Sequence, residues 1–520
     1  MNPSVVFLEQ LLSDLPVAHQ VRGEVAGREV RGIVFDSNEV KPGFIFVAFP
    51  GINADGHDYI GKAVEQGAVA VVGSRAEVNI SVPYIRVENP RQAIAYLAAT
   101  FYGHPARKLT VIGVTGTDGK TTTSNLIFQI LLAAGLKAGV ITTVNAQIGD
   151  ETVDTGFHVT TPEAIEVQPY LARMVAAGLT HAVLETTSHG LAQHRVDGSE
   201  YDIAVVTNIT HEHLDFHGSY EGYLAAKARL FSMLDETVTK PQGNPRLAVL
   251  NRDDRSYSPL LPYIKSGKVS YSIAGSGDVN AEKIKSSSDG VRFTARSKDF
   301  VQEITCNIPG EFNVSNCLAA LCATVYGLGI APQVAAQGIA ALTGVPGRME
   351  VIDYGQPFTA VVDFAHTPNA LERAIQTARS MTSGRVITVF GSAGLRDRQK
   401  RRMMADVSVR QADLTVLTAE DPRIESLDDI LAEMADAAVA AGGVEGDNFF
   451  RVPDRGDAIR KALALARPGD LVISCGKGHE KSMCFGTVEY PWDDRIAMCA
   501  ALAELTGKFG PAMPQLPTSK

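Results

Sequence analysis

Short apolar runs rich in β-branched residues alternate with segments of helical period along nearly the whole chain. In the first hundred residues these runs predict strands at Val30–Phe35, Phe44–Phe49, Val69–Gly73 and Tyr84–Val87. Apolar residues at helical spacing predict helices at Tyr59–Gln66 and Pro90–Tyr102. Residues 1–107 are therefore expected to form a small α/β domain.

The same alternation continues to the end of the chain, and most apolar runs end in polar residues. The strands expected in residues 108–345 are Val111–Thr115, Ala138–Thr143, His181–Glu185, Ile203–Asn208 and Leu247–Asn251. A turn at Gly344–Gly347 marks the next boundary, and residues 346–520 repeat the pattern at Thr359–Phe364, Arg385–Phe390, Leu414–Thr418 and Leu471–Cys475. Strands separated by helices predict an α/β fold of three domains with mainly parallel sheets. The Pro-rich tail, Phe509–Lys520, is expected to be loose.

The stretch from Leu109 to Asn125, LTVIGVTGTDGKTTTSN, combines a strand, a glycine-rich turn and a helix. This geometry lets backbone N–H groups surround a phosphate at a helix N-terminus. The predicted cradle comprises Gly116, Thr117, Asp118, Gly119, Lys120, Thr121 and Thr122. Lys120 would reach the terminal phosphates, and the Thr121 hydroxyl would bind magnesium. The spacing departs from the strict P-loop pattern, so a plain Gly-Thr turn with an exposed lysine is the alternative.

Polar residues at the ends of the next strands suit magnesium phosphate. Glu185 ends a buried strand and is a candidate Mg²⁺ ligand, the alternative being a helix N-cap acid. His213 follows the next strand and is either a second metal ligand or a structural histidine. Lys227 lies on a predicted helix, where physical reasoning alone favours a solvated surface lysine. Arg195, shortly after Gly190, offers a planar fork of donors for a carboxylate or phosphate.

Four polar clusters follow strands of the C-terminal part. They are Asp363–Pro368, Arg396–Arg398, Glu420–Arg423 and Gly476–Glu480. Because the carboxyl ends of parallel strands share one edge of a sheet, the clusters are expected to converge on one ligand.

Composition narrows the class of protein. The 520 residues are 45% hydrophobic with a net charge of −10, which gives no sign of a nucleic-acid or membrane surface. The six cysteines show no zinc-site spacing and are expected to be buried free thiols in a reducing compartment. The N-terminal segment carries acids and lacks the form of a secretion signal, and no apolar run approaches membrane-spanning length. A cytoplasmic protein is expected.

Several motifs in this order resemble the Mur ligase family, the ATP-dependent amino-acid-adding enzymes of peptidoglycan synthesis. TGTDGKTTT is shared with the related folylpolyglutamate synthases, whereas ETTSHGLAQHR, NITHEHLDFHG, YLAAK, PGRME, DFAHTP, DPR and GKGHE point to the branch that adds a diamino acid to UDP-N-acetylmuramoyl-L-alanyl-D-glutamate. The resemblance implies a UDP-substrate domain at 1–107, an ATP domain at 108–345 and a Rossmann-like amino-acid domain at 346–520. It further implies ATP and Mg²⁺ as requirements and a role in cell-wall formation and cell division, and we expect a monomer.

The resemblance also assigns roles to individual residues. The phosphate and magnesium contacts would come from Lys120 and Thr121, with Glu185, His213 and a carbamylated Lys227 as further metal ligands. The remaining nucleotide contacts would come from Asn313, Asn316, Arg348 and Asp363. The UDP-sugar-peptide would be held by Ser37, Thr160, Thr161, Thr187, Gln193 and Arg195. The diamino acid would be held by Arg396, Asp421, Arg423, Gly476 and Glu480.

One departure bears on the amino acid that is added. The diaminopimelate signature of the family is Asp-Asn-Pro-Arg, and this chain has Glu420-Asp421-Pro422-Arg423. Arg423 would pair with the distal carboxylate of meso-2,6-diaminopimelate, whereas Asp421 would favour the bare ammonium of L-lysine or L-ornithine. Diaminopimelate is the first expectation. A folylpolyglutamate synthase-like ligase and a non-enzymatic nucleotide-binding scaffold are the alternatives.

Overall fold

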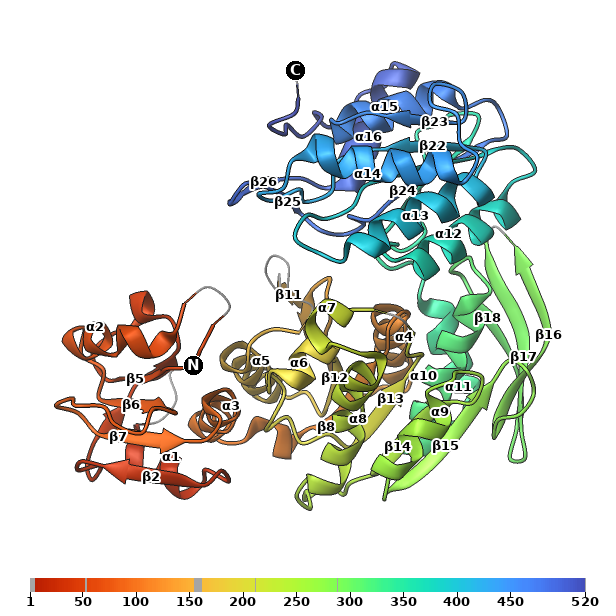
Figure 1. The fold of residues 1–520 in the computed structure, drawn as a ribbon. Coiled ribbons are helices and arrows are strands. Elements are labelled where there is room, and N and C mark those ends of the chain that lie inside the picture. Colours follow the sequence, from red (N-terminus) through yellow and green to blue (C-terminus); the bar gives the residue numbers. More distant parts are fainter. Residues whose placement is uncertain (1–4, 52–53, 154–160, 211, 288, 520) are drawn as a thin grey trace.

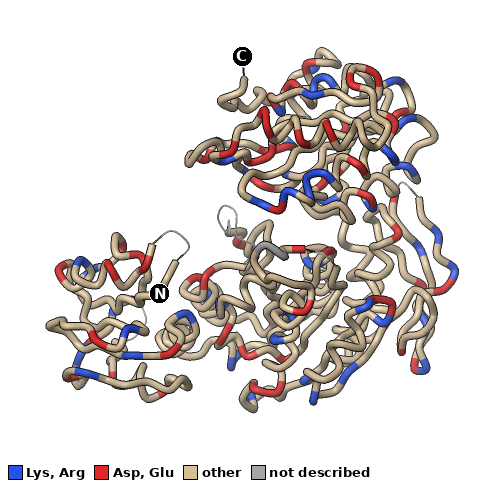
Figure 2. The backbone as a smooth tube through the Cα atoms, viewed as in Figure 1, with Lys and Arg blue, Asp and Glu red and all other residues tan. Residues whose placement is uncertain are grey.

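The computed structural model of the 520-residue chain describes residues 5–51, 54–153, 161–210, 212–287 and 289–519. Three principal sheets follow one another along the sequence, each covered by helices (Figure 1). The predicted α/β class is confirmed. The central sheet lies between the other two along the chain, and Figure 1 shows the N-terminal part to the left of the central part and the C-terminal part above it. Acidic and basic residues are interspersed over all three parts (Figure 2).

The N-terminal sheet has five strands in the order β2-β7-β6-β5-β4. They are β2 (His19–Arg22), β4 (Gly32–Val34), β5 (Phe44–Val47), β6 (Ala70–Gly73) and β7 (Tyr84–Val87). A small ladder pairs β1 (Val6–Phe7) with β3 (Glu29–Val30). One apolar cluster joins one face of the sheet to α1 (Leu8–Ser13) and α3 (Pro90–Phe101), and another joins the other face to α2 (Ile60–Glu65). The expected strand at 30–35 is divided, because Arg31 separates β3 from β4.

The central sheet has eleven strands in the order β11-β10-β9-β12-β8-β13-β14-β15-β16-β17-β18. The strands are β8 (Thr110–Thr115), β9 (Ala138–Ile141), β10 (Ala146–Ile148), β11 (Glu151–Val153), β12 (His181–Glu185), β13 (Ile203–Val206), β14 (Leu247–Asn251), β15 (Gly267–Ser272), β16 (Val279–Ser287), β17 (Gly290–Ser297) and β18 (Val301–Cys306). The run from β9 to β15 is parallel, with β8 at its middle between β12 and β13. The loop after β8 therefore opens where chain connections diverge to both sides, the usual position of a ligand in such sheets.

Helices cover both faces of this sheet. One apolar cluster contains α4 (Lys120–Ala133), α10 (Phe312–Leu328) and α11 (Pro332–Ala341). The other contains α5 (Ala164–Ala176), α6 (Ser188–Ala192), α8 (Tyr220–Glu236) and α9 (Tyr257–Leu260). The short helix α7 (Leu214–His217) precedes α8.

The C-terminal sheet has six strands in the order β19-β20-β24-β21-β22-β23. They are β19 (Glu350–Ile352), β20 (Thr359–Asp363), β21 (Val386–Phe390), β22 (Leu414–Leu417), β23 (Phe449–Arg451) and β24 (Leu471–Cys475), parallel except for β19. One face carries α12 (Pro368–Met381), α13 (Arg398–Gln411) and α14 (Leu427–Ala440), and the other carries α15 (Arg455–Leu465) and α16 (Asp494–Thr506). A hairpin of β25 (Ser482–Phe485) and β26 (Val488–Pro491) extends from the end of β24.

The expectation of a loose tail is wrong. Met513 and Leu516 are buried in the apolar cluster that joins α15 and α16 to the sheet. The hydroxyls of Thr518 and Ser519 each donate a hydrogen bond of 2.9 Å to Asp454, the N-cap residue of α15. The tail is therefore part of the C-terminal core. All six cysteines are free, and two of them, Cys484 and Cys499, are only half-buried.

Candidate functional site

The predicted phosphate cradle closes over the end of β8. Gly116 has a φ of 151°, and a Cβ there would lie 1.8 Å from the Thr207 hydroxyl. Gly119 has a φ of 82°, and a Cβ there would lie 2.3 Å from the Asn316 side chain. Both positions thus exclude other residues by conformation and by space. Lys120, the first residue of α4, folds back so that its Nζ donates to the Thr117 carbonyl at 2.8 Å.

Two residues that follow the neighbouring strand β13 hold the cradle in place. The Asn208 Oδ1 accepts from the Asp118 N–H at 3.0 Å, and the Thr207 hydroxyl donates to the Asp118 carbonyl at 2.6 Å. The Thr117 hydroxyl lies 3.1 Å from the Tyr223 hydroxyl. Thr122 is buried in the first turn of α4. Sequence reasoning did not find the part played by Asn208, because its role depends on strand pairing.

A hydroxyl and a carboxylate lie together beside the cradle. The Thr121 hydroxyl donates to Glu185 Oε1 at 3.0 Å, and Glu185 Oε2 accepts from the Thr143 N–H at 2.9 Å. Oxygen ligands of this kind suit Mg²⁺, which usually keeps water and substrate phosphates among its ligands. Within the described residues, no group of three or more His, Cys, Asp or Glu could hold a metal by itself. The donor set therefore fits a magnesium ion that arrives with phosphate, and does not form a complete protein cage.

Lys227 is buried, and its assignment as a surface residue is wrong. Its Nζ donates to the Gly116 carbonyl at 2.7 Å and lies 4.5 Å from the centre of the Tyr223 ring. Burial, with Lys120 nearby, lowers the pKa of Lys227 well below its usual value. The sequence did contain a signal: Tyr223 and Leu230, four before and three after, are both apolar and buried, so helical period places Lys227 on the inward face of α8.

His213 immediately precedes α7 and faces Lys227. Its ring packs edge-on against His189, with the centroids 4.6 Å apart, and it has a left-handed φ of 53°. Desolvation, together with His189, lowers the pKa of His213 far below that of a free imidazole. The preceding Glu212 is buried and faces Lys400, Asp118, Lys120 and Lys227. Sequence reasoning did not assign a role to Glu212.

A cavity of about 620 Å³ opens next to the cradle, between the central and C-terminal sheets. This is a typical size for a pocket that encloses a small ligand. Both predicted asparagines line it, although their amides are partly used by the scaffold: the Asn313 amide donates to the Pro309 carbonyl and the Asn316 amide donates to Asn313, each at 2.9 Å.

The connection to the C-terminal sheet supplies the other wall of the cavity. Arg348 donates to the Thr121 hydroxyl at 3.1 Å and lies over the Phe364 ring, while its buried Nε has no partner among the described residues. Asp363 accepts from the N–H groups of Met349 at 2.7 Å and Ala365 at 2.8 Å. Asp363 therefore sets the path of the backbone that carries Arg348.

A second predicted group lies in the central part, around α6. The Thr161 and Thr187 hydroxyls are 3.0 Å apart, and Arg195 donates to the Thr161 carbonyl and to Gln193. Arg195 also pairs with Glu163 at 2.9 Å, which sequence reasoning missed. Thr160 lies outside the described residues. Ser37 is buried at the start of a short 3-10 turn in the N-terminal part, following β4.

The C-terminal clusters converge as predicted, because β20, β24, β21 and β22 are consecutive and parallel. Asp421 does not offer a free charge: both of its oxygens accept from the buried Lys477 Nζ, at 3.0 and 3.1 Å, and Lys477 also pairs with Glu480. Gly476 has a φ of 107°, and a Cβ there would lie 2.2 Å from Glu420. The expectation that Asp421 would present its charge to a bare ammonium is therefore wrong, because Lys477 already neutralises that charge.

Two arginines complete this group, which we call the rim and define as Arg396, Glu420–Arg423 and Gly476–Glu480. Arg423 has a left-handed φ of 54° and reaches the Gly394 carbonyl at 3.4 Å, and Arg396 is exposed. Lys400, which sequence reasoning missed, faces both Glu420 of the rim and Glu212 beside the cradle, with 3.6 Å between its Nζ and Glu212. Lys400 thus lies between an acid of the rim and an acid beside the phosphate cradle.

Three family models match the chain in sequence order. They are "Mur ligase family, catalytic domain" over residues 29–102, "Mur ligase middle domain" over 114–324 and "Mur ligase, glutamate ligase domain" over 347–478.

Similar proteins match over almost the whole chain. A UDP-N-acetylmuramyl-tripeptide synthetase of Roseiflexus sp. (strain RS-1) is 45% identical over 92% of this chain and 95% of its own. A UDP-N-acetylmuramoyl-L-alanyl-D-glutamate–2,6-diaminopimelate ligase of Geobacillus thermodenitrificans is 40% identical over 96% of this chain and 99% of its own. A solved structure of a ligase of the same name has a TM-score of 0.67 and 28% identity, covering 97% of this chain and all (100%) of the other.

Proposed function

The chain belongs to the Mur ligase family, and from this we propose that it joins a diamino acid to UDP-N-acetylmuramoyl-L-alanyl-D-glutamate at the expense of ATP, releasing ADP and phosphate. The observation that carries the proposal is the contact of the phosphate cradle with the C-terminal part through Arg348 and Asn369. Lys400 adds to it, because it faces both Glu212 beside the cradle and Glu420 of the rim. We place the reaction in the cytoplasm, catalysed by a monomer, as a step in the synthesis of peptidoglycan. No helix in the described part of the chain is long and apolar enough to cross a bilayer.

The three parts of the chain divide the reactants. We assign residues 1–107 to the UDP end, 108–345 to ATP and 346–520 to the diamino acid. The cradle from Gly116 to Thr122 would surround the phosphates, and Asn313, Asn316, Arg348 and Asp363 would define the rest of the nucleotide pocket. Ser37 would lie near uracil, and the sugar-peptide would be held by Thr160, Thr161, Thr187, Gln193 and Arg195.

Thr121 and Glu185 would hold magnesium, with His213 and a carbamylated Lys227 as ligands of a second ion. Bound magnesium would offset the negative charge that gathers on the transferring phosphoryl group. Carbamylation requires a neutral amine, and Lys227 is buried against a carbonyl and a ring without an ion pair among the described residues. The reaction of that amine with carbon dioxide would place a carboxylate beside the cradle.

The reaction needs two displacements. The D-glutamate carboxylate of the substrate attacks the γ-phosphorus of ATP, so that an acyl phosphate forms and ADP leaves. The amine of the diamino acid then attacks the acyl carbon, and phosphate leaves from the tetrahedral intermediate. Lys120 would stabilise charge in the first step, while the domains hold the reactants together.

We propose meso-2,6-diaminopimelate as the amino acid. Its distal end carries a carboxylate as well as an ammonium, and Arg423 supplies the guanidinium that recognises a carboxylate. Because Lys477 already compensates Asp421, this acid does not weaken that pairing. Arg396, Gly476 and Glu480 would complete the site. L-Lysine and L-ornithine, which lack the distal carboxylate, are the alternative substrates.

The test is phosphate release from ATP with UDP-muramyl dipeptide, with diaminopimelate, lysine and ornithine supplied separately. We expect release with diaminopimelate and at least ~10²-fold less with lysine, because lysine leaves Arg423 without its partner. Faster release with lysine or ornithine would contradict the assignment of the amino acid. Release with none of them would contradict the ligase activity itself.

A further inference from the structure

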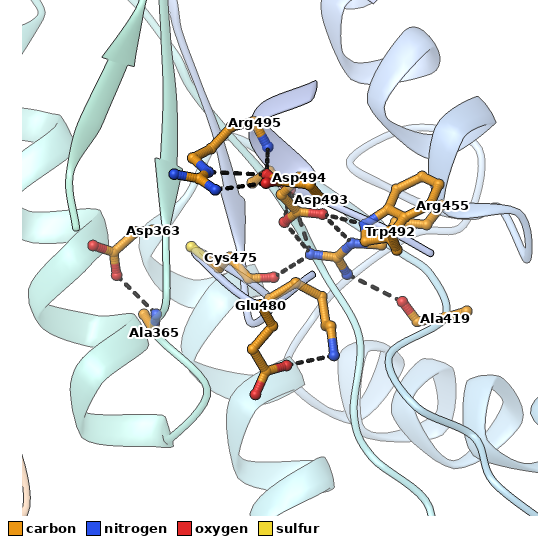
Figure 3. Close-up of polar contacts among 12 residues, drawn as sticks. Asp363, Ala365, Ala419, Arg455, Cys475, Glu480, Trp492, Asp493, Asp494 and Arg495 are labelled. Atoms are coloured by element: carbon orange, nitrogen blue, oxygen red, sulfur yellow. Dashed lines mark hydrogen bonds and ion pairs between the residues drawn. The ribbon is translucent and has the colours of Figure 1, made fainter. Parts of the chain in front are cut away.

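A fully buried guanidinium lies beneath the rim. Arg455, the first residue of α15, donates to the Ala419 carbonyl at 3.1 Å and to the Cys475 carbonyl at 2.7 Å (Figure 3). Ala419 immediately precedes Glu420, and Cys475 immediately precedes Gly476. One side chain therefore binds the backbone directly before both rim loops, Glu420–Arg423 and Gly476–Glu480.

Strand pairing does not connect Ala419 and Cys475 directly. In the sheet, β21 lies between β24 and β22, so no ladder hydrogen bond joins the strand that ends before Gly476 to the one that leads to Glu420. Arg455 spans this interval. Its planar fork of donors can hold several acceptors in fixed directions, which the single nitrogen of a lysine cannot do.

A carboxylate fixes the guanidinium in turn. Asp494 accepts from Arg455 Nε at 2.7 Å and from Arg455 Nη2 at 2.6 Å, and both residues are fully buried. Asp494 also accepts from the Trp492 indole at 2.8 Å (Figure 3). The Ser474 hydroxyl donates to the same carboxylate at 2.9 Å. This network leaves Arg455 little freedom to change its direction, as a positioning role requires.

We infer that Arg455, held by Asp494, is a positioning residue that sets the separation of the two rim loops and thereby the fit of the diamino acid. The inference rests on the proposed function, because it takes the rim as the amino-acid site. The geometry has a counterpart at the opposite edge of the same sheet. There Arg385 pairs with Asp470 at 2.6 Å and donates to the Leu465 carbonyl at 2.7 Å, at the amino ends of β21 and β24 and away from the rim.

The experiment compares Arg455→Lys with Arg385→Lys in phosphate-release kinetics. For Arg455→Lys we expect the KM for diaminopimelate to rise about tenfold or more, because small displacements of binding groups are costly. The KM values for ATP and UDP-muramyl dipeptide should stay within about twofold of the wild-type values. The cradle and the residues around Arg195, to which these substrates are assigned, belong to the central part of the chain and not to the C-terminal part that contains Arg455. For Arg385→Lys all three KM values should stay within the same limit.

A second variant covers the case in which Arg455→Lys does not fold. Arg455→Met with Asp494→Asn removes both charges and retains an amide oxygen for Trp492, so no unpaired charge is buried. It should show the same selective rise in KM. An unchanged KM for diaminopimelate in a folded variant, or an equal rise in all three values, would overturn the inference. Wild-type protein that releases no phosphate with any diamino acid would refute the proposed function instead.

Discussion

Two buried lysines lie in opposite surroundings, Lys227 beside the phosphate cradle and Lys477 within the rim. Lys477 is bonded to Asp421 and paired with Glu480, and these carboxylates raise its pKa despite its burial. Within the described residues, Lys227 donates to the Gly116 carbonyl and lies against the Tyr223 ring without an ion pair, and burial lowers its pKa. The same side chain thus has a raised pKa at one site and a lowered pKa at the other.

The contrast distinguishes a lysine that holds loops in place from a lysine whose amine could react. A compensated ammonium is chemically inert and useful for holding loops, as Lys477 holds Asp421 and Glu480. A buried amine without a counter-ion is costly to charge and free to react, which is the condition that carbamylation needs. The predictions below vary the two sites in parallel.

The largest effect should come from removing the Lys227 amine. Lys227→Ala should lower the rate of ligation by about 10³-fold, the upper range for loss of one group that stabilises developing charge. Short carboxylates such as acetate should restore part of the activity by entering the space left behind. Full activity of Lys227→Ala in phosphate release, with no response to acetate, would show that the amine takes no part in the reaction.

Stability should show the opposite order: replacing Lys477 should destabilise the protein more than replacing Lys227. Lys477→Met leaves Asp421 and Glu480 without their counter-charge and should lower the free energy of unfolding by about 3–5 kcal/mol. Lys227→Met loses one hydrogen bond but also removes an amine whose lowered pKa disfavours its burial at neutral pH, so it should cost no more than about 1 kcal/mol. Urea denaturation of both variants measures this, and equal losses would contradict the difference between the surroundings of the two lysines.

Glu420 tests the electrostatics of the rim through pH. It is buried, faces Arg455, Lys400, Lys477 and Asp421, and desolvation raises its pKa from 4.5 to about 7. The native state therefore binds more protons than the unfolded state between these values, and stability falls by roughly 3 kcal/mol as pH rises through them.

Glu420→Gln should remove this loss. Urea denaturation at pH 5 and at pH 8 should show wild-type protein losing stability relative to the variant, with the full difference present above pH 7. Parallel pH profiles for the two proteins would contradict burial of an ionisable Glu420.

The smallest effect is expected at the contact between the cradle and the C-terminal part. The Asn369 amide donates to Asp118 Oδ2 at 3.2 Å across the two parts. Asn369→Ala should raise the KM for ATP by no more than about fivefold, since one hydrogen bond contributes about 1 kcal/mol. Arg379→Ala, further along α12 and paired with Asp413 at the surface, is the control and should leave this KM unchanged.

The sequence predicted those strands whose pattern of apolar residues matches their burial in the fold. Strands buried on both faces appear as short β-branched runs, so β8, β12 and β21 were visible in advance. The cradle was equally clear, because all of its residues are contiguous. The rim required the assumption of parallel strands, which the topology confirms.

The remainder depends on contacts that no local pattern encodes. The edge strand β2 is polar and exposed, and so lacks the alternation of a half-buried strand. The tail is anchored by Met513 and Leu516, two isolated apolar residues among prolines. Glu163, Glu212 and Lys400 gain their roles only when distant loops meet, and Arg455 acts on residues 36 and 20 positions away.

The most direct measurement of the central contrast is carbon-13 NMR of the protein equilibrated with labelled bicarbonate, Mg²⁺ and ATP. A carbamate resonance should be present in wild-type protein, absent from Lys227→Ala and retained in an otherwise folded Lys477→Met. A spectrum without a carbamate signal, or one that Lys227→Ala leaves unchanged, would contradict the account of Lys227 as the reactive amine of the site.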